Sequence, residues 1–249
     1  MIYLLAPAFN EADNLPSLAD SVKKILDSGY RMIIVNDGST DNTFEVATKL
    51  SRKYPIIPLG YQNNKGPGYA FNYGISHFLI ISKKKDFLVT IEADNSSDLS
   101  VLKKMKDLVK TYDVIVASPF EKGGRYVGVP FFRQILSHGY QILLSAIFRI
   151  KGTSSYGNFF RAYSREILSK AQKVYGNNLI TENGFSCSAE LLIKLDKVGA
   201  KISSIPALID WTRKRGKSKM KIAKYIRRQF IFIIKFWLLS GIYLKGDES

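Results

Sequence analysis

Cysteine and histidine are scarce in this chain of 249 residues, which contains one cysteine and two histidines. Cys187 has no second cysteine with which to form a disulfide, so a disulfide-stabilised fold is excluded. His77 and His138 are too few and too far apart in the sequence to form a zinc cluster. This composition fits a reducing compartment such as the cytosol.

Long apolar runs are also missing. The N-terminus reaches Pro7 and Asn10 without the basic start and apolar stretch of a signal peptide, so we expect no secretion. Near the other end, the apolar segment 230–244 has 15 residues and is interrupted by Lys235. A membrane-spanning helix needs roughly 20 apolar residues, so we expect this segment not to cross a bilayer.

Acidic residues are outnumbered by basic ones, 21 against 37, which gives a formal charge of +16. After position 200 there are twelve Lys and Arg against three Asp and Glu. Nucleic acid, anionic lipid or a phosphorylated substrate could each explain this excess, and so could a merely solvated surface. Charge alone does not choose among these partners.

Short apolar runs alternate with helical patterns along the first 200 residues. The runs are rich in β-branched residues and predict buried parallel strands at 2–6, 32–36, 87–91 and 114–117. Apolar residues recur at helical spacing over 15–26, 101–109 and 190–198, and a further strand is expected at 201–205. We therefore predict an α/β fold with a mostly parallel sheet flanked by helices.

The segment 130–149 differs from these elements because it predicts a helix that is unusually apolar for a protein surface. We expect it to face lipid rather than water. As domains, we expect a catalytic domain over 1–219, which includes this helix, and a basic amphipathic segment over 220–249.

Polar residues follow three of the predicted strands, at 7–11, 35–41 and 92–94. Parallel strands present their carboxyl ends at one edge of a sheet, which is where ligands bind. Asp37 at such an end could accept hydrogen bonds from the ring N–H groups of uracil or guanine. In isolation, Asp37 could equally form an Asp-Gly turn before a helix that Ser39 or Thr40 caps.

Glu92 and Asp94 lie two residues apart on one side of an extended chain. Such carboxylates suit Mg²⁺ or Mn²⁺ bridging a diphosphate, where the metal stabilises the departing nucleoside diphosphate. The alternative is an acidic loop that caps the next helix through Ser97 or Asp98. A glycine-rich segment at 64–68 could allow close approach of the donor, or could be a structural loop.

The ordered set resembles the family 2 inverting glycosyltransferases, and within them the dolichyl- or polyprenyl-phosphate mannosyltransferases. The resemblance spans residues 2–219 and rests on the segments 7–11, 36–41, 64–74, 92–94, 160–163 and 213–219. It implies a GT-A-like fold, a nucleoside-diphosphate sugar as donor and a lipid phosphate as acceptor.

The resemblance also implies roles for individual residues. The nucleotide site would comprise Pro7, Ala8, Asn10, Glu11, Asp37, Lys65, Gly66 and Ala93. Asp94 and Glu92 would hold the metal, with Asp94 also counted as catalytic. Arg213, Ser218 and Lys219 would contact phosphates from a loop.

Three departures from the family pattern affect the metal site or its neighbourhood: Asn36 and Glu92 replace aspartates, and Ser96 stands where the family often has Gln or His. A fourth concerns the acceptor, because Pro119 replaces an arginine that commonly meets the acceptor phosphate. Arg125 and Arg133 are the candidates to take over that arginine's role.

The C-terminal segment carries a facial pattern of charge. At 100° per residue, its basic side chains gather within about 120° and leave an apolar arc that includes Ile226, Phe230, Ile233 and Trp237. We expect this helix to lie on an anionic membrane surface, as a peripheral protein at the cytoplasmic face. Packing of the same helix against the catalytic domain is the alternative.

Together these features predict inverting sugar transfer to a polyprenyl or dolichyl phosphate at a membrane surface. One alternative is transfer to a saccharide or glycolipid hydroxyl, which needs a carboxylate base such as Glu182 or Glu190. The other is a basic module without catalytic activity that binds membrane or nucleic acid. Nucleic acid is the less expected partner.

Overall fold

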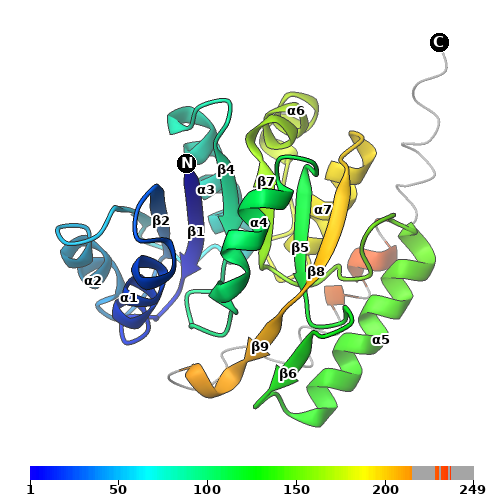
Figure 1. Ribbon diagram of the computed structural model, residues 1–249, viewed down its shortest axis with the longest axis horizontal. Helices are drawn as coiled ribbons and strands as arrows, with labels where there is room; N and C mark the ends of the chain where they lie inside the picture. The colour runs from blue at the N-terminus through cyan, green and yellow to red at the C-terminus, as the bar shows by residue number, and fades with distance from the viewer. Residues whose placement is uncertain (215–227, 230, 235, 237–249) are drawn as a thin grey trace.

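The computed structural model describes residues 1–214, 228–229, 231–234 and 236. Its centre is a seven-stranded sheet in the order β3-β2-β1-β4-β7-β5-β8 (Figure 1). The strands are β1 (Ile2–Ala8), β2 (Tyr30–Asp37), β3 (Ile56–Tyr61), β4 (Phe87–Thr90), β5 (Val114–Ser118), β7 (Arg161–Ser164) and β8 (Ile202–Pro206). A separate pair, β6 (Arg125–Val127) and β9 (Leu208–Asp210), forms a small parallel sheet.

The large sheet is parallel except at β7, which pairs antiparallel with both β4 and β5. The register of β1 and β2 aligns Ala8 with Asn36, so these two strands end side by side. The carboxyl ends of β1, β2, β4 and β5 therefore share one edge of the sheet. This edge carries the polar segments that the sequence singles out.

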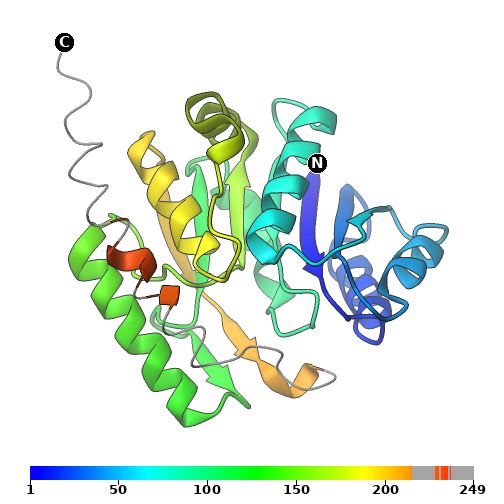
Figure 2. The same cartoon turned by 180° about the vertical axis from the view of Figure 1, so that it is seen from behind.

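Helices cover both faces of the sheet in a three-layer arrangement (Figures 1 and 2). Alternate strand residues point to opposite faces, so Leu4 and Leu5 enter two different core clusters. One cluster includes residues of α1 (Leu15–Leu26), α2 (Thr43–Leu50) and α4 (Leu102–Leu108). The other includes residues of α3 (Pro67–Ile81), α6 (Arg165–Tyr175) and α7 (Cys187–Lys197). Three short 3₁₀ turns, η1 (Leu99–Val101), η2 (Gly176–Asn178) and η3 (Trp211–Arg213), complete the described elements.

Helix α5 (Phe131–Phe148) lies at one side of the sheet, next to the small β6–β9 pair (Figure 1). The exposed residues of this helix fall on one face: Phe131, Phe132, Ile135, His138, Gly139, Ile142, Leu143 and Ala146. None of these is Lys, Arg, Asp or Glu. On the inner side, Leu144 is completely buried and joins the core cluster of α6 and α7.

The predicted α/β fold is confirmed. The strands expected from apolar runs correspond to β1, β2, β4, β5 and β8, and the helical patterns correspond to α1, α4, α5 and α7. Two strands of the large sheet, β3 and β7, were not predicted, and neither were β6 and β9 of the small sheet. Edge strand β3 has only one buried residue, Ile56, and β7 is four residues long with Arg161 at its start, so neither shows a continuous apolar run.

The C-terminal segment is described only at 228–229, 231–234 and 236. Here Phe232 and Ile233 are buried and belong to the same core cluster as Leu144, whereas Ile231 and Ile234 are exposed. Ile233, which belongs to the predicted apolar arc, therefore packs within the protein, as in the alternative in which this helix packs against the catalytic domain. Ile226, Phe230, Trp237 and most of the basic face lie outside the described residues.

Among the helices that the structure describes, none combines the length and the apolar character needed to cross a bilayer.

Candidate active site

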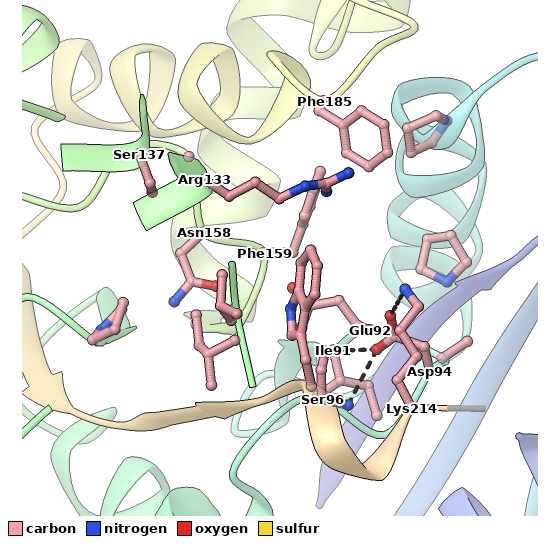
Figure 3. Close-up of a pocket in the computed structure, with 18 of the residues that line it drawn as sticks. Ile91, Glu92, Asp94, Ser96, Arg133, Ser137, Asn158, Phe159, Phe185 and Lys214 are labelled. Atoms are coloured by element: carbon pink, nitrogen blue, oxygen red, sulfur yellow. Dashed lines mark hydrogen bonds and ion pairs between the residues drawn. The ribbon is translucent and has the colours of Figure 1, made fainter. Parts of the chain in front are cut away.

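A cavity of about 510 Å³ opens at the carboxyl ends of the central strands. One side is formed by Pro7, Ala8 and the acidic residues after β4, and the other by α5 and the segment 157–159. Figure 3 shows Glu92, Asp94 and Lys214 grouped together, with Arg133 and Phe185 across the cavity from them. A cleft that joins several elements at this edge is the expected location of a ligand site in an α/β fold.

Asp37, the last residue of β2, lines this cavity. Its carboxylate also holds the residues 61–66 at the end of β3 in place. One oxygen, Oδ1, accepts hydrogen bonds from Tyr61 Oη (2.8 Å) and from the amide of Lys65 (2.8 Å). The other, Oδ2, accepts from Asn64 Nδ2 and from the amide of Gly66, each at 3.0 Å. Asp37 is 3% exposed, so these contacts compensate the cost of burying its charge.

Two glycines allow this loop to lie so close. Gly38 has a φ of +61°, and a Cβ there would lie 2.3 Å from the amide nitrogen of Asn64. Gly66 has a φ of +94°, and a Cβ would lie 2.3 Å from the carbonyl oxygen of Asn183. Both positions therefore require glycine for conformation and for space. The glycine-rich segment that begins at Asn64 thus packs against the 183 loop and leads into α3.

The residues after β1 connect the first two strands. The Asn10 amide donates to Ser39 Oγ (2.9 Å), and Asn10 Oδ1 accepts from the Thr40 amide (2.8 Å). The Glu11 amide donates to Thr43 Oγ1 (2.9 Å). Pro7, Ala8 and Glu11 line the cavity, whereas Asn10 and Lys65 are not among its lining residues. The Lys65 ammonium lies over the Tyr69 ring at 4.2 Å.

The acidic segment after β4 contributes Glu92, Ala93 and Asp94 to the cavity wall. Asp94 Oδ1 accepts from the Ser96 amide (3.1 Å) and from Ser96 Oγ (2.6 Å). Asp94 Oδ2 forms an ion pair with Lys214 Nζ at 2.5 Å. Glu92 accepts a hydrogen bond from Ser97 Oγ.

The two carboxylates sit in different electrostatic surroundings. Burial, followed by the neighbouring charge of Asp94, raises the pKa of Glu92 to about 7, while the Ser97 hydrogen bond opposes the rise. Glu92 is thus partly protonated near neutral pH when no cation accompanies it. A metal ion here would favour the charged form of Glu92.

The donor set fits a hard divalent cation that shares its coordination with a substrate. Within the described part of the chain, no three His, Cys, Asp or Glu side chains converge as in a metal site built from protein alone. Mg²⁺ is commonly held by one or two carboxylates together with substrate phosphates, and Glu92 with Asp94 supplies that number. Asp94 moreover already carries a cationic partner, the ammonium of Lys214.

The segment that precedes Lys214 is fixed to the acidic loop. The Asp210 amide donates to the Ser96 carbonyl (3.0 Å), and an isolated bridge joins Ser97 to Ile209. Arg213 is half-exposed and pairs with Asp210 at 3.1 Å, away from the cavity-lining set. The structure thus brings Lys214 to the acidic residues, while Arg213, for which the resemblance implies contact with phosphates, is not among the cavity-lining residues. Ser218 and Lys219 lie outside the described residues.

Glu190, which we considered as a base, does not line the cavity. It is completely buried, and its carboxylate accepts hydrogen bonds from Thr181 N (3.0 Å) and Glu182 N (2.8 Å) and pairs with Lys194 at 2.6 Å. The assignment of Glu190 to catalysis is therefore not supported, because its lone pairs are used to hold the 181–182 backbone.

Arg161, part of the matched segment 160–163, is also completely buried. Its guanidinium donates to the carbonyls of Ser188 and Tyr156, the latter at 2.6 Å. These bonds tie α7 to the chain just before Gly157 and Asn158, which line the cavity. Arg161 thus holds in place the chain that forms part of the cavity wall, without lining the cavity itself.

The wall opposite the acidic residues is largely apolar and aromatic. Phe159 stands 5.9 Å from Phe185 between ring centroids, in an edge-to-face arrangement. Trp211 connects this wall to the acidic side, because its ring lies 5.0 Å from the Arg133 guanidinium of α5 and 5.7 Å from Lys214 Nζ. All of these residues line the cavity. Arg133 is thus placed in the cavity, whereas Arg125 is not among its lining residues.

Sequence reasoning assigned no role to Lys214, Trp211, Phe159 or Phe185. Lys214 adjoins the recognised Arg213 but was counted only as one of many C-terminal cations. The aromatic residues carried no periodic signal that separates a cavity wall from a core.

The fold is of the GT-A type: a mostly parallel sheet whose strand ends line one cavity, with an acidic pair after β4. Residues 3–171 match the description "Glycosyl transferase family 2". The chain belongs to glycosyl transferase family 2 and is an enzyme.

Relatives of known name extend the similarity along the chain. The chain is 29% identical to the dolichol-phosphate mannosyltransferase of Pyrococcus furiosus, over 97% of this chain and 69% of that protein. It is 30% identical to a dolichyl-phosphate beta-glucosyltransferase of Trichomonas vaginalis, over 90% of this chain and 69% of that protein.

Solved structures agree with the fold. The glucosyl-3-phosphoglycerate synthase of Mycobacterium tuberculosis, in complex with Mn²⁺, UDP and glucosyl-3-phosphoglycerate, superposes with a TM-score of 0.65 at 18% identity. That match covers 96% of this chain and 79% of that one. TarS of S. aureus in complex with UDP gives a TM-score of 0.56 at 17% identity, covering 84% of this chain and 60% of the other.

Proposed function

We propose that the protein transfers a sugar, with inversion, from a nucleoside-diphosphate sugar to a polyprenyl or dolichyl phosphate at a membrane surface. The observation that carries this proposal is the composition of the cavity described above. Its strand-end side bears the carboxylates, and its other side is formed by a helix whose outer face is apolar and exposed. The names of the two relatives support the same acceptor class.

The donor would lie along the ends of β1 and β2. Pro7, Ala8 and Asp37 would border the nucleoside, together with Gly66, and Ala93 would approach the diphosphate. Mg²⁺ or Mn²⁺ held by Glu92 and Asp94 would neutralise charge on the leaving nucleoside diphosphate. The protein's own residues would orient the sugar and exclude water from it.

The distribution of carboxylates favours a phosphate acceptor over a hydroxyl. Among the described cavity-lining residues, the acidic ones are Glu11, Asp37, Glu92 and Asp94, all after β1, β2 or β4. The side formed by α5 contributes Arg133 and no carboxylate. A phosphate monoester, with a second pKa near ~6, is mostly ionised at neutral pH and needs no base to attack the anomeric carbon.

A direct assay of the acceptor tests this assignment. Transfer should occur to a short polyprenyl phosphate and not to the matching polyprenol. Arg133→Ala should raise the KM for the lipid phosphate about tenfold or more, because a cation facing the acceptor phosphate is lost. Arg213→Ala, which removes a cation paired with Asp210 outside the cavity, is the matched comparison. Transfer to the alcohol alone would establish the hydroxyl-acceptor alternative.

Membrane association is the second part of the proposal, and α5 supports it. Phe131 is 76% exposed and Ile142 is 70% exposed on a face without charged residues. An apolar helical face of this kind inserts at the boundary between head groups and acyl chains. A lipid acceptor would then reach Arg133, on the inner side of α5, by a short path. The basic residues after Lys214 would add attraction to anionic head groups.

Liposome sedimentation tests this part. The double variant Phe131→Ser with Ile142→Ser should bind vesicles containing anionic lipid several-fold more weakly than the parent protein. Ile80→Ser is the matched control, since Ile80 is 80% exposed on α3, a different helix. Equal binding by all three proteins would leave α5 without a role at the membrane.

Divalent-metal-dependent binding of GDP or UDP, measured by calorimetry, would identify the donor base.

A further inference from the structure

Lys214 is a cation in direct contact with the carboxylate proposed to hold the metal. Its Nζ lies 2.5 Å from Asp94 Oδ2, and the two side chains are 17% and 14% exposed, respectively. Nothing in the sugar-transfer scheme above uses Lys214, although it lines the same cavity. Partial burial makes this contact stronger than an ordinary surface ion pair.

The contact is built into the fold. Lys214 follows β9 and η3, a segment joined to the acidic loop by the Ser97–Ile209 bridge and by the hydrogen bond from the Asp210 amide to Ser96. The Lys214 ammonium also lies 5.7 Å from the centre of the Trp211 ring. The backbone thus delivers Lys214 to Asp94, and the ring face adds a second attraction for its charge.

We propose that Lys214 is an exchangeable counter-ion of the metal site. Before donor and metal bind, its ammonium neutralises Asp94, and it therefore competes with the divalent cation for that carboxylate. Once displaced, the ammonium moves to the diphosphate of the donor. This inference rests on the proposed metal role of Asp94.

The physical reason for the competition is that an ammonium and a divalent cation repel one another at a shared oxygen. A metal at Asp94 Oδ2 would find Lys214 at contact distance, so one of the two cations must move. The lysine side chain can do so, because it carries a point charge on a flexible four-carbon stem. A diphosphate entering with the metal supplies the negative charge that receives it.

The proposed competition with the metal and the proposed transfer to the diphosphate predict opposite changes in affinity for one substitution. In Lys214→Ala, Mn²⁺ alone should bind about tenfold more tightly, because no resident cation has to be displaced. In the same variant and at saturating Mn²⁺, UDP or GDP, whichever the parent protein binds, should bind about tenfold more weakly, because the diphosphate loses a cationic partner. Lys214→Arg should stay close to the parent protein in both measurements.

The experiment is a titration of full-length protein with Mn²⁺, followed by electron paramagnetic resonance of the unbound ion, first without and then with nucleotide. Lys110→Ala is the matched control, because Lys110 forms an exposed ion pair with Asp107 and neither residue lines the cavity. A purely structural loss in Lys214→Ala would weaken both affinities together, and circular dichroism reports the folded state of each variant.

Unchanged or weaker binding of Mn²⁺ alone to a folded Lys214→Ala protein would overturn the competition. Unchanged nucleotide affinity would overturn the transfer to the diphosphate. Asp94→Asn separates this inference from the proposed function: undiminished Mn²⁺ binding in that variant would remove the metal site itself. If Asp94→Asn weakens Mn²⁺ binding as expected but Lys214→Ala changes neither affinity, the metal site stands and only the counter-ion role of Lys214 is rejected.

Discussion

Asp37 and Asp94 are both aspartates at the carboxyl edge of the same sheet, yet their carboxylates are stabilised in different ways. Asp37 accepts hydrogen bonds from the amides of Lys65 and Gly66, which the backbone holds in place. Asp94 accepts from only one amide of the described chain, that of Ser96 at Oδ1, and its Oδ2 pairs with the ammonium of Lys214, at the end of a flexible side chain. The charge of Asp37 is thus neutralised by fixed parts of the fold, whereas the charge of Asp94 is neutralised by a partner that can be replaced.

An amide that points at a carboxylate cannot leave without rearranging the loop, whereas an ammonium can rotate away. Asp37 is therefore a positioning residue for the glycine-rich loop as well as a candidate contact for the nucleobase. Asp94 is better suited to exchange one cation for another during a reaction cycle.

The largest expected effect concerns Asp94. Asp94→Asn should reduce kcat by about 100-fold or more, since a neutral amide is a poor ligand for the metal that stabilises the leaving diphosphate. The protein should still fold, because Ser96 can donate to the amide oxygen, but it should lose some stability because Lys214 loses its charged partner. Initial-rate kinetics with circular dichroism as the control checks this, and near-normal turnover would place the metal elsewhere.

Asp37→Ala should act on the fold and on the ligand together. The loss of a buried acceptor for several donors should cost about 2–3 kcal/mol of unfolding free energy. Nucleotide affinity should also fall, equally with and without an attached sugar. Urea denaturation and calorimetry report the two effects, with Asp107→Ala as the exposed control. Lost stability with unchanged GDP and UDP affinity would restrict Asp37 to its role in the loop.

Glu190 extends the comparison, because its buried carboxylate is held by backbone amides like that of Asp37. Glu190→Gln should lower the unfolding free energy by roughly 1–3 kcal/mol, since Lys194 loses its charged partner. Turnover should stay within a few fold of the parent protein below the melting temperature. Complete loss of transfer in a folded Glu190→Gln protein would instead return Glu190 to the role of base.

Substitution of Glu92 should have the smallest effect, and it should appear as a change in how the stability of the protein depends on pH. Its pKa is raised from an ordinary 4.5 to about 7, so the folded protein binds more protons than the unfolded chain between these values. Stability of the metal-free protein should therefore fall as pH rises from about 4.5 to about 7, by roughly 1–3 kcal/mol, and level off above.

Glu92→Gln should remove most of that slope, because its side chain does not ionise. Urea denaturation in EDTA across this pH range measures the difference between the two proteins. Identical pH slopes of stability in the two proteins would mean that the pKa of Glu92 is not raised by folding.

Sequence reasoning succeeded where local pattern and structure obey the same rule. The apolar runs became β1, β2, β4 and β5 because a strand buried on both faces must be continuously apolar. The apolar helix expected over 130–149 is observed as α5, Phe131–Phe148. Strand β7 escaped prediction because Arg161, a charged residue buried on backbone carbonyls, breaks the apolar pattern.

The candidate site followed the same division. Asp37, Glu92 and Asp94 were recognisable from their position after apolar runs, and the structure places all three along one cavity. Glu190 was chosen by residue type alone, and its burial against Thr181 could not be read from the chain. Arg213 and Lys214 are adjacent, and only the path of the chain after β9 decides which of them meets Asp94.

The sequence by itself determined the α/β architecture and the polar, acidic character of the sheet edge that lines the cavity, because strand burial and strand-end chemistry are local properties. The tertiary structure alone decided which charges are permanently satisfied and which are exchangeable. That distinction depends on contacts between residues far apart in the chain, such as Lys214 with Asp94, and no local spacing encodes them.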